Sequence, residues 1–175
     1  ELEACGLWAR LYADIALTPS VRALVERLAR DGASLDLRLL ALTSGAETGD
    51  AALRFLKSVR APASALGLAQ TFWSQRDALF SMKTPEDAAR VFEKIDVVRR
   101  RERAEALLLF CSRLAEIEGL PVRWTQDELS QLLDAWTSID AGAVAKAQTD
   151  PRAIPEAVRA ARREALLACA GRLEN

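Results

Sequence analysis

The sequence predicts an all-α fold, a bundle of about seven to nine helices. Three observations support this class: helix-capping residues and prolines recur along the chain, apolar residues follow helical spacing, and no stretch has the alternation and β-branched content of a strand. The chain has 175 residues, of which 50% are hydrophobic and 28% are charged. That is enough for one globular domain with a sizeable core, and it excludes a disordered tail or a disulfide-stabilised miniprotein.

Helices in the first half of the chain are delimited by caps, prolines and glycines. The first is expected over residues 2–16, from the helical spacing of Leu7, Trp8, Leu11 and Ile15. Further helices are expected over residues 19–30, 35–43 and 51–59, and another begins at Pro62. Residues 43–49 contain two glycines and three hydroxyl side chains. They match neither a phosphate-binding loop nor a dinucleotide fingerprint, so we expect them only to connect two helices.

Helix starts are clearest in the second half of the chain. Thr84 and Thr125 are each followed by acidic residues in the first turn, as helix capping favours. We therefore assign these acids to capping and not to a metal site: Glu86, Asp87, Asp127 and Glu128. A helix over residues 98–118 is apolar nearly all round in its middle, so we expect it to be central and buried. The last helix is expected to begin at Pro155 and to end at Gly171.

Composition excludes several kinds of chemistry. The sequence contains no histidine, which removes Ser-His and Cys-His nucleophile pairs and the commonest metal ligand. It also lacks an Asp-x-Asp pair of the kind that holds metal ions for phosphoryl transfer. The cysteines, Cys5, Cys111 and Cys169, are expected to be reduced core residues of a cytoplasmic protein. No apolar run is long enough to span a membrane, and no signal sequence is expected.

Arginines gather at two places in the chain. The net charge is -1, so any contact with nucleic acid must come from such local patches. The clusters are Arg99, Arg100, Arg101 and Arg103, then Arg152, Arg159, Arg162 and Arg163. Guanidinium groups suit phosphate because they bind its oxygens bidentately and stay charged. The alternative is a solvated helix end whose arginines are neutralised by nearby acids. Trp8, Trp73 and Trp136 lie in apolar stripes, so we expect core packing and not a base-stacking platform.

Four segments, taken in order, carry a family resemblance. They are Leu56–Pro62, Phe92–Arg103, Ile139–Ala143 and Ile154–Val158. From about Leu53 onward, the chain resembles the carboxy-terminal region of bacterial tRNA nucleotidyltransferases, the CCA-adding enzymes whose catalytic head is followed by a helical body with an HD phosphohydrolase domain. The stretches that match the HD metal ligands, residues 42–45 and 70–73, contain no histidine. The resemblance therefore implies a degenerate HD-like helical domain without a metal site.

The resemblance also implies a piece of a longer enzyme whose amino-terminal catalytic head lies outside this chain, an expectation that fits a start at Glu1. We expect one helical domain over residues 1–175, divisible into a degenerate HD-like part at 1–82 and a tail at 83–175. The head would add nucleotides to the tRNA 3′ end from CTP and ATP with magnesium. No catalytic residue, metal or cofactor is expected in this chain.

The partner implied by the resemblance is tRNA, held on its acceptor and T-arm side. The expected RNA-binding residues are Arg99, Arg100, Arg103, Arg159 and Arg163. Within each group two arginines are four apart, which predicts a shared helix face for each pair. They would contact phosphates and 2′-hydroxyls of an A-form stem. The alternative is a helical protein-interaction or regulatory domain with no nucleic-acid role. Such a domain could be a monomer or a dimer.

Overall fold

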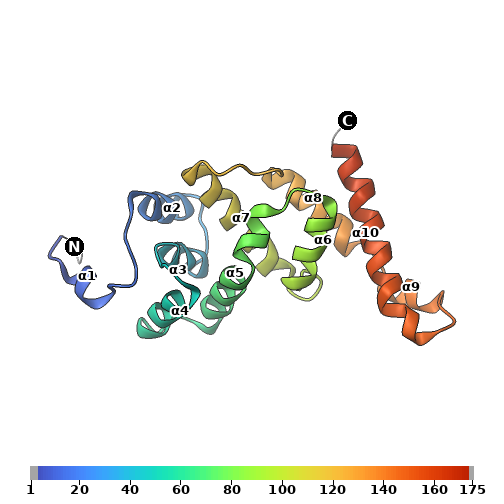
Figure 1. The fold of residues 1–175 in the computed structure, drawn as a ribbon, viewed down its shortest axis with the longest axis horizontal. Coiled ribbons are helices and arrows are strands. Elements are labelled where there is room, and N and C mark those ends of the chain that lie inside the picture. The colour runs from blue at the N-terminus through green and yellow to red at the C-terminus, as the bar shows by residue number, and fades with distance from the viewer. Residues whose placement is uncertain (1–3, 174–175) are drawn as a thin grey trace. The chain divides into compact units, whose positions relative to one another are not determined.

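The computed structural model describes residues 4–173, and the regular elements in that range are helices (Figure 1). The all-α prediction is confirmed. The α-helices are α1 (Leu7–Leu11), α2 (Pro19–Arg30), α3 (Leu35–Thr43), α4 (Gly49–Ser58), α5 (Ala63–Ser81), α6 (Pro85–Lys94), α7 (Arg101–Glu118), α8 (Gln126–Thr137), α9 (Ala141–Lys146) and α10 (Ile154–Leu173), and η1 (Pro151–Ala153) is a 3-10 helix. One isolated antiparallel bridge joins Ile15 and Ala46.

The chain forms two compact units. Unit 1 comprises residues 1–76 and 109–121, and unit 2 comprises residues 77–108 and 122–175. The division falls inside α5 and inside α7, so each of these helices contributes to both units. Each unit has buried apolar side chains of its own.

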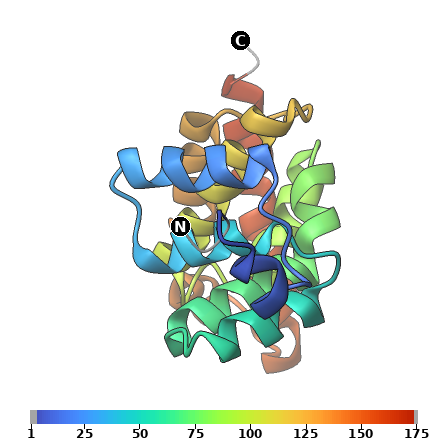
Figure 2. The ribbon, with the colours of Figure 1, turned by 90° about the vertical axis from the view of Figure 1, so that its left-hand side faces the viewer.

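In unit 1, α2 packs against α3, and α3 packs against α4 (Figure 2). Several leucines of these helices are 0% exposed: Leu24, Leu28, Leu40 and Leu56. Phe72 of α5 and Phe110 of α7 are also 0% exposed, and their rings meet edge to face with centroids 5.0 Å apart. The apolar middle of the predicted central helix therefore supplies core residues, as expected.

In unit 2, α10 packs against α6, α8 and α9. Trp136 of α8 is 1% exposed, and its ring meets Phe92 of α6 edge to face with centroids 5.9 Å apart. Leu166 of α10 is fully buried as well. The core assignment of Trp136 is confirmed, whereas Trp8 and Trp73 of unit 1 are half-buried.

Both predicted caps at helix starts are confirmed. At α6 the Thr84 hydroxyl accepts from the Asp87 amide at 3.1 Å, and the Asp87 carboxylate accepts from the Thr84 amide at 3.0 Å. At α8 Thr125 and Glu128 form the same reciprocal pair, at 3.3 and 2.7 Å. The backbone amides that reach these carboxylates hold the pKa of Asp87 and the pKa of Glu128 below their ordinary values. These two acids therefore serve the helix ends.

The first predicted helix is wrong over most of its length. Instead of a helix over residues 2–16, the chain is helical only in α1, then turns at residues 13–14 and reaches the isolated bridge at Ile15, with residues 1–3 outside the described range. The indole Nε1 of Trp8 donates to the Ile15 carbonyl at 2.8 Å. The Ala16 amide donates to the Gly45 carbonyl at 2.9 Å. These contacts from α1 and from the α3–α4 loop replace the hydrogen bonds that a continuous helix would make.

The long helix α7 begins at Arg101 and not at residue 98. The preceding helix ends in a turn in which Asp96 has a φ of 55°. The Asp96 carbonyl accepts from the amides of both Arg99 and Arg100, at 3.2 and 3.0 Å. Residues 95–100 are therefore a turn that separates α6 from α7.

Within residues 4–173, four helices are followed by a residue in the left-handed region. Backbone amides at or just after that residue donate to carbonyls of the last helical turn. Gly32 and Gly119 occupy this position after α2 and α7, with φ of 70° and 65°. Arg60 and Asp96 occupy it after α4 and α6, with φ of 53° and 55°. A residue with a Cβ is less stable than glycine in this conformation. The ends of α4 and α6 therefore carry a conformational cost.

Smaller differences concern the carboxy-terminal elements. The last helix begins at Ile154, one residue before the predicted Pro155, and it continues through Gly171 to Leu173. Gly171 is not in the left-handed conformation that ends helices at glycine, so the helix continues through it. The short elements α9 and η1 were not expected. They begin after Asp140 and Asp150, whose carboxylates accept from backbone amides of the first turn.

The cysteines divide between the core and the surface. Cys111 and Cys169 are buried, as predicted, and none of the three forms a disulfide. Burial raises the pKa of the Cys111 thiol, so this side chain stays protonated. The core prediction for Cys5 is wrong: it is exposed, because it precedes α1, a helix without buried residues.

Candidate nucleic-acid interface

The five arginines predicted to bind RNA all belong to unit 2. They come from two places in it, the α6–α7 turn with the start of α7, and the first half of α10. Four of them are exposed, namely Arg99, Arg100, Arg159 and Arg163, and Arg103 is half-buried. The structure thus leaves most of these guanidinium groups accessible to a large ligand.

The first group does not lie on one helix face. Arg99 and Arg100 are in the turn before α7, whereas Arg103 is inside the helix. The expectation that Arg99 and Arg103 share a helix face is therefore wrong, because the turn at the left-handed residue Asp96 delays the start of α7. Arg100 Nε lies 4.0 Å from the Asp96 carboxylate. Arg99 makes no ion pair with any residue in the described range, so its charge is the least neutralised of the group.

Arg101 is occupied by contacts within unit 2. Its guanidinium donates to Glu105 at 2.8 Å, to the Thr137 hydroxyl at 2.8 Å, and to the Asp134 carboxylate. Its hydrogen bonds with Asp134 and Glu105 raise its pKa. This arginine ties the first turn of α7 to the end of α8, as the solvated-helix-end alternative expects. It is not available to phosphate.

Arg103 is partly enclosed. Its Nε is buried, and burial together with the nearby charge of Arg100 lowers its pKa. A half-buried guanidinium offers fewer donors to an external phosphate than an exposed one. Arg103 is therefore the least accessible of the five predicted residues.

The two arginines of the second group share a helix face. Arg159 and Arg163 both lie in α10, and both reach the carboxylate of Glu156. The distances from Glu156 are 3.1 Å to Arg159 Nε and 3.7 Å to Arg163 Nη1. The shared helix face is confirmed. Two cations share a single carboxylate here, so this face carries excess positive charge.

The neighbouring arginines of that cluster have other surroundings. The Arg162 guanidinium carbon lies 5.5 Å from the centre of the Trp136 ring, and its Nε is buried. This cation–π contact packs α10 against α8. Arg152 is exposed in η1. Its exposure makes it a further candidate beside Arg159 and Arg163.

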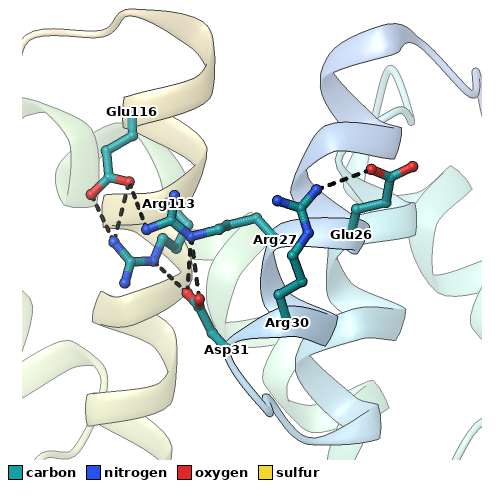
Figure 3. Close-up of polar contacts among 6 residues, drawn as sticks. All are labelled: Glu26, Arg27, Arg30, Asp31, Arg113 and Glu116. Atoms are coloured by element: carbon teal, nitrogen blue, oxygen red, sulfur yellow. Dashed lines mark hydrogen bonds and ion pairs between the residues drawn. The ribbon is translucent and has the colours of Figure 1, made fainter.

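A different group of arginines in unit 1 is fully matched by acids (Figure 3). Arg113 of α7 donates to Asp31 at 2.9 Å and to Glu116 at 2.8 Å. Arg27 of α2 donates to Asp31 at 3.2 Å and lies 3.9 Å from Glu116. Burial raises the pKa of Asp31, but the hydrogen bonds from Arg113 and Arg27 outweigh it and hold the pKa below its ordinary value. These four side chains close a ring that joins α2 to α7.

Neither a metal site nor a membrane-spanning helix is found among the described residues. Over 4–173 no three cysteine, aspartate or glutamate side chains come together in a way that could hold a metal ion. In the same range, no helix has the length and apolarity needed to cross a lipid bilayer.

Comparison with known proteins gives one kind of match. The chain is 31% identical over 166 residues to the CCA-adding enzyme of Bordetella pertussis, and equally to that of Bordetella bronchiseptica. The match covers 94% of this chain but 43% of each enzyme. No protein-family model matches the chain, and no solved structure does. The resemblance to CCA-adding enzymes is thus confirmed over nearly the whole chain, which spans less than half the length of the curated relatives that it matches.

Proposed function

We propose that this chain is the carboxy-terminal helical region of a CCA-adding enzyme and that it binds tRNA without itself being catalytic. The observation that carries the proposal is the match to two CCA-adding enzymes over 94% of the chain. Exposed arginines in unit 2 supply the chemistry, because guanidinium groups neutralise backbone phosphates and release counterions. The proposed location is the cytoplasm.

In this proposal the two arginine groups hold a tRNA stem by its backbone. Arg99 and Arg100 project from a turn, and Arg159 and Arg163 project from one face of α10. Contacts of this kind recognise the shape of an A-form helix and its 2′-hydroxyls, not its sequence. We assign them to the acceptor and T-arm side of tRNA. Arg103 has a smaller part, since it is half-buried.

The chemical step is proposed to lie on a head region outside these 175 residues. That region would bind CTP, ATP and magnesium and extend the tRNA 3′ end. The HD-like part of the present chain is proposed to be degenerate, because the sequence has no histidine to serve as a metal ligand. The present chain would contribute affinity and orientation.

Salt-dependent binding tests this function. Fluorescence anisotropy would measure the affinity of the 175-residue chain for a labelled tRNA minihelix, which contains only the acceptor and T-arm stem, over a range of salt concentrations. Replacing Arg99 and Arg100 together with alanine should weaken binding and reduce the salt slope by about 1 for each phosphate that the chain no longer neutralises. Replacing Arg159 and Arg163 should do the same.

The control is Arg38→Ala, because Arg38 is an exposed arginine of α3 whose side chain makes no ion pair within the described residues. It should leave affinity and slope unchanged. Equal slopes for the wild type and both double variants would remove these arginines from the interface. Absence of any salt-dependent binding would favour the interaction-domain alternative.

A further inference from the structure

Two adjoining hollows lie in unit 1, and the segment of residues 12–16 contributes to the walls of both. The first has a volume of about 260 Å³ and is lined by Arg10, Tyr12 and Phe55, among others. The second has a volume of about 360 Å³. Asp14 and Arg54 line both hollows, and their side chains form an ion pair at 2.8 Å. The helical spacing of apolar residues in this part of the sequence predicts a continuous helix, so the sequence alone gives no sign of the two hollows.

The non-helical segment that walls these hollows is held by contacts from outside itself. Trp8 and Gly45 bond to its backbone, and the Ala16 backbone passes so close to Gly45 that a Cβ there would lie 2.0 Å from the Ala16 carbonyl oxygen. Long-range contacts thus override a local preference for helix. Such conflicts between local preference and observed structure are expected at functional sites.

The lining of the first hollow includes both charged and aromatic side chains. Arg10 and Arg54 contribute two positive charges, and Asp14 contributes one negative charge. Arg10 makes no ion pair with any residue between 4 and 173. The rings of Tyr12 and Phe55 meet edge to face with centroids 5.1 Å apart. Aromatic and apolar walls with a few polar groups are typical of sites for small-molecule ligands.

We propose that the first hollow binds a nucleoside monophosphate or a close analogue, that is, a planar heteroaromatic ring carrying a phosphate. The ring would pack on Tyr12 and Phe55, and the phosphate would bind Arg10 and Arg54. Two guanidinium groups match the charge of a phosphate monoester and bind its oxygens bidentately. On binding, Arg54 exchanges the Asp14 carboxylate for the phosphate. The site lies in unit 1, so it does not depend on the arginines of unit 2 or on the proposed function.

Titration with adenosine 5′-monophosphate tests the proposal on the 175-residue chain. Trp8 reports on the site, because its ring centroid lies 4.9 Å from that of Tyr12. The tryptophan fluorescence of the chain, to which Trp8 contributes together with three other tryptophans, should change with a dissociation constant of about 1 mM or tighter, and calorimetry should give the same constant. The double variant Arg10→Ala, Arg54→Ala should bind at least about tenfold more weakly, since the phosphate then has no charge-assisted hydrogen bonds from these residues.

A variant that should strengthen ligand binding distinguishes a binding site from an ion pair with only a structural role. Asp14→Asn removes the carboxylate that competes for Arg54, so it should strengthen binding several-fold, whereas removal of a purely structural ion pair would weaken it. Arg38→Ala is the matched control and should bind as the wild type does. The proposal is overturned if the wild type does not bind, if the double variant binds equally well, or if inorganic phosphate binds as tightly as the nucleotide.

Competition assigns the source of the nucleotide. If adenosine 5′-monophosphate displaces part of a labelled tRNA minihelix, the hollow takes a nucleotide of the RNA chain. If both bind together, the ligand is a free nucleotide. Failure of the unit 2 arginine variants to alter tRNA affinity would overturn the proposed RNA interface and leave the nucleotide result standing, so the two proposals fail separately.

Discussion

Replacement of Trp136 tests the packing of unit 2 most severely. This side chain is 1% exposed, meets Phe92 edge to face, and lies under the Arg162 guanidinium. Truncation of a buried tryptophan to alanine costs about 3 to 5 kcal/mol of unfolding free energy. The aromatic pair and the cation–π contact are each worth about 1 kcal/mol beyond burial, so we expect Trp136→Ala to lie near the upper end of that range.

A second variant at this position distinguishes the ring from its nitrogen. The Trp136 indole Nε1 is buried and has no hydrogen-bond acceptor within the described residues. Phenylalanine keeps an aromatic ring and removes that N–H, so Trp136→Phe should cost less than about half as much as alanine. Urea unfolding followed by circular dichroism measures both values. The control, Leu167→Ala, replaces a side chain that is 49% exposed and should change stability by under about 0.5 kcal/mol. A cost below about 1 kcal/mol for Trp136→Ala would refute the core assignment.

Three further predictions concern the backbone and the caps. Gly45→Ala should lower the free energy of unfolding in urea by about 2 to 4 kcal/mol, because its Cβ would collide with the Ala16 carbonyl and break the adjoining hydrogen bond. Gly171→Ala is the control and should raise the free energy of unfolding by about 0.5 to 1 kcal/mol, since a Cβ there meets nothing within 4 Å. Equal effects of the two substitutions would contradict the geometry at Gly45. Asp96→Gly should relieve a left-handed residue, stabilise the fold by about 1 kcal/mol or less and so raise the melting temperature, and a fall in melting temperature would show that the turn is not strained. The pKa of Glu128 is lower in the folded chain than its ordinary 4.5, so its contribution to stability is present above that pH and is lost as the pH falls through the folded value. Glu128→Gln should therefore flatten the decline of stability at acid pH, and an unchanged acid limb would count against the capping contact.

Local signals in the sequence accounted well for two helix starts and one core residue in the second half of the chain. Thr84 and Thr125 predicted both the start of a helix and the role of the acids beside them, because a capping box is complete within four residues. The burial of Trp136 followed from apolar spacing on a single helix. These features depend on residues close together in the chain.

Two of the failures share a physical cause, since each depends on a partner distant in sequence. The helix expected over residues 2–16 is interrupted because Gly45 accepts from Ala16, a contact invisible to local periodicity. The same holds for the charge on Arg101, whose partner Asp134 is 33 residues away. Local pattern could identify an arginine cluster but could not tell which members are already paired.

The candidate RNA site shows the same division. Arg159 and Arg163 share a face as the four-residue spacing predicts, because α10 is continuous through both. Arg99 and Arg103 do not, because a left-handed residue, Asp96, delays the next helix. Left-handed aspartate has no reliable local signal, since glycine is the residue usually found there.

Photo-crosslinking of the chain to a tRNA minihelix, with the crosslinked peptides identified by mass spectrometry, tests the central claim most directly. We predict crosslinks within residues 95–103 and 154–163 that disappear at high salt and are reduced in the arginine double variants. Crosslinks that fall elsewhere in unit 2 or only in unit 1 around the charge-matched Arg27 and Arg113, or that are insensitive to salt, would contradict it.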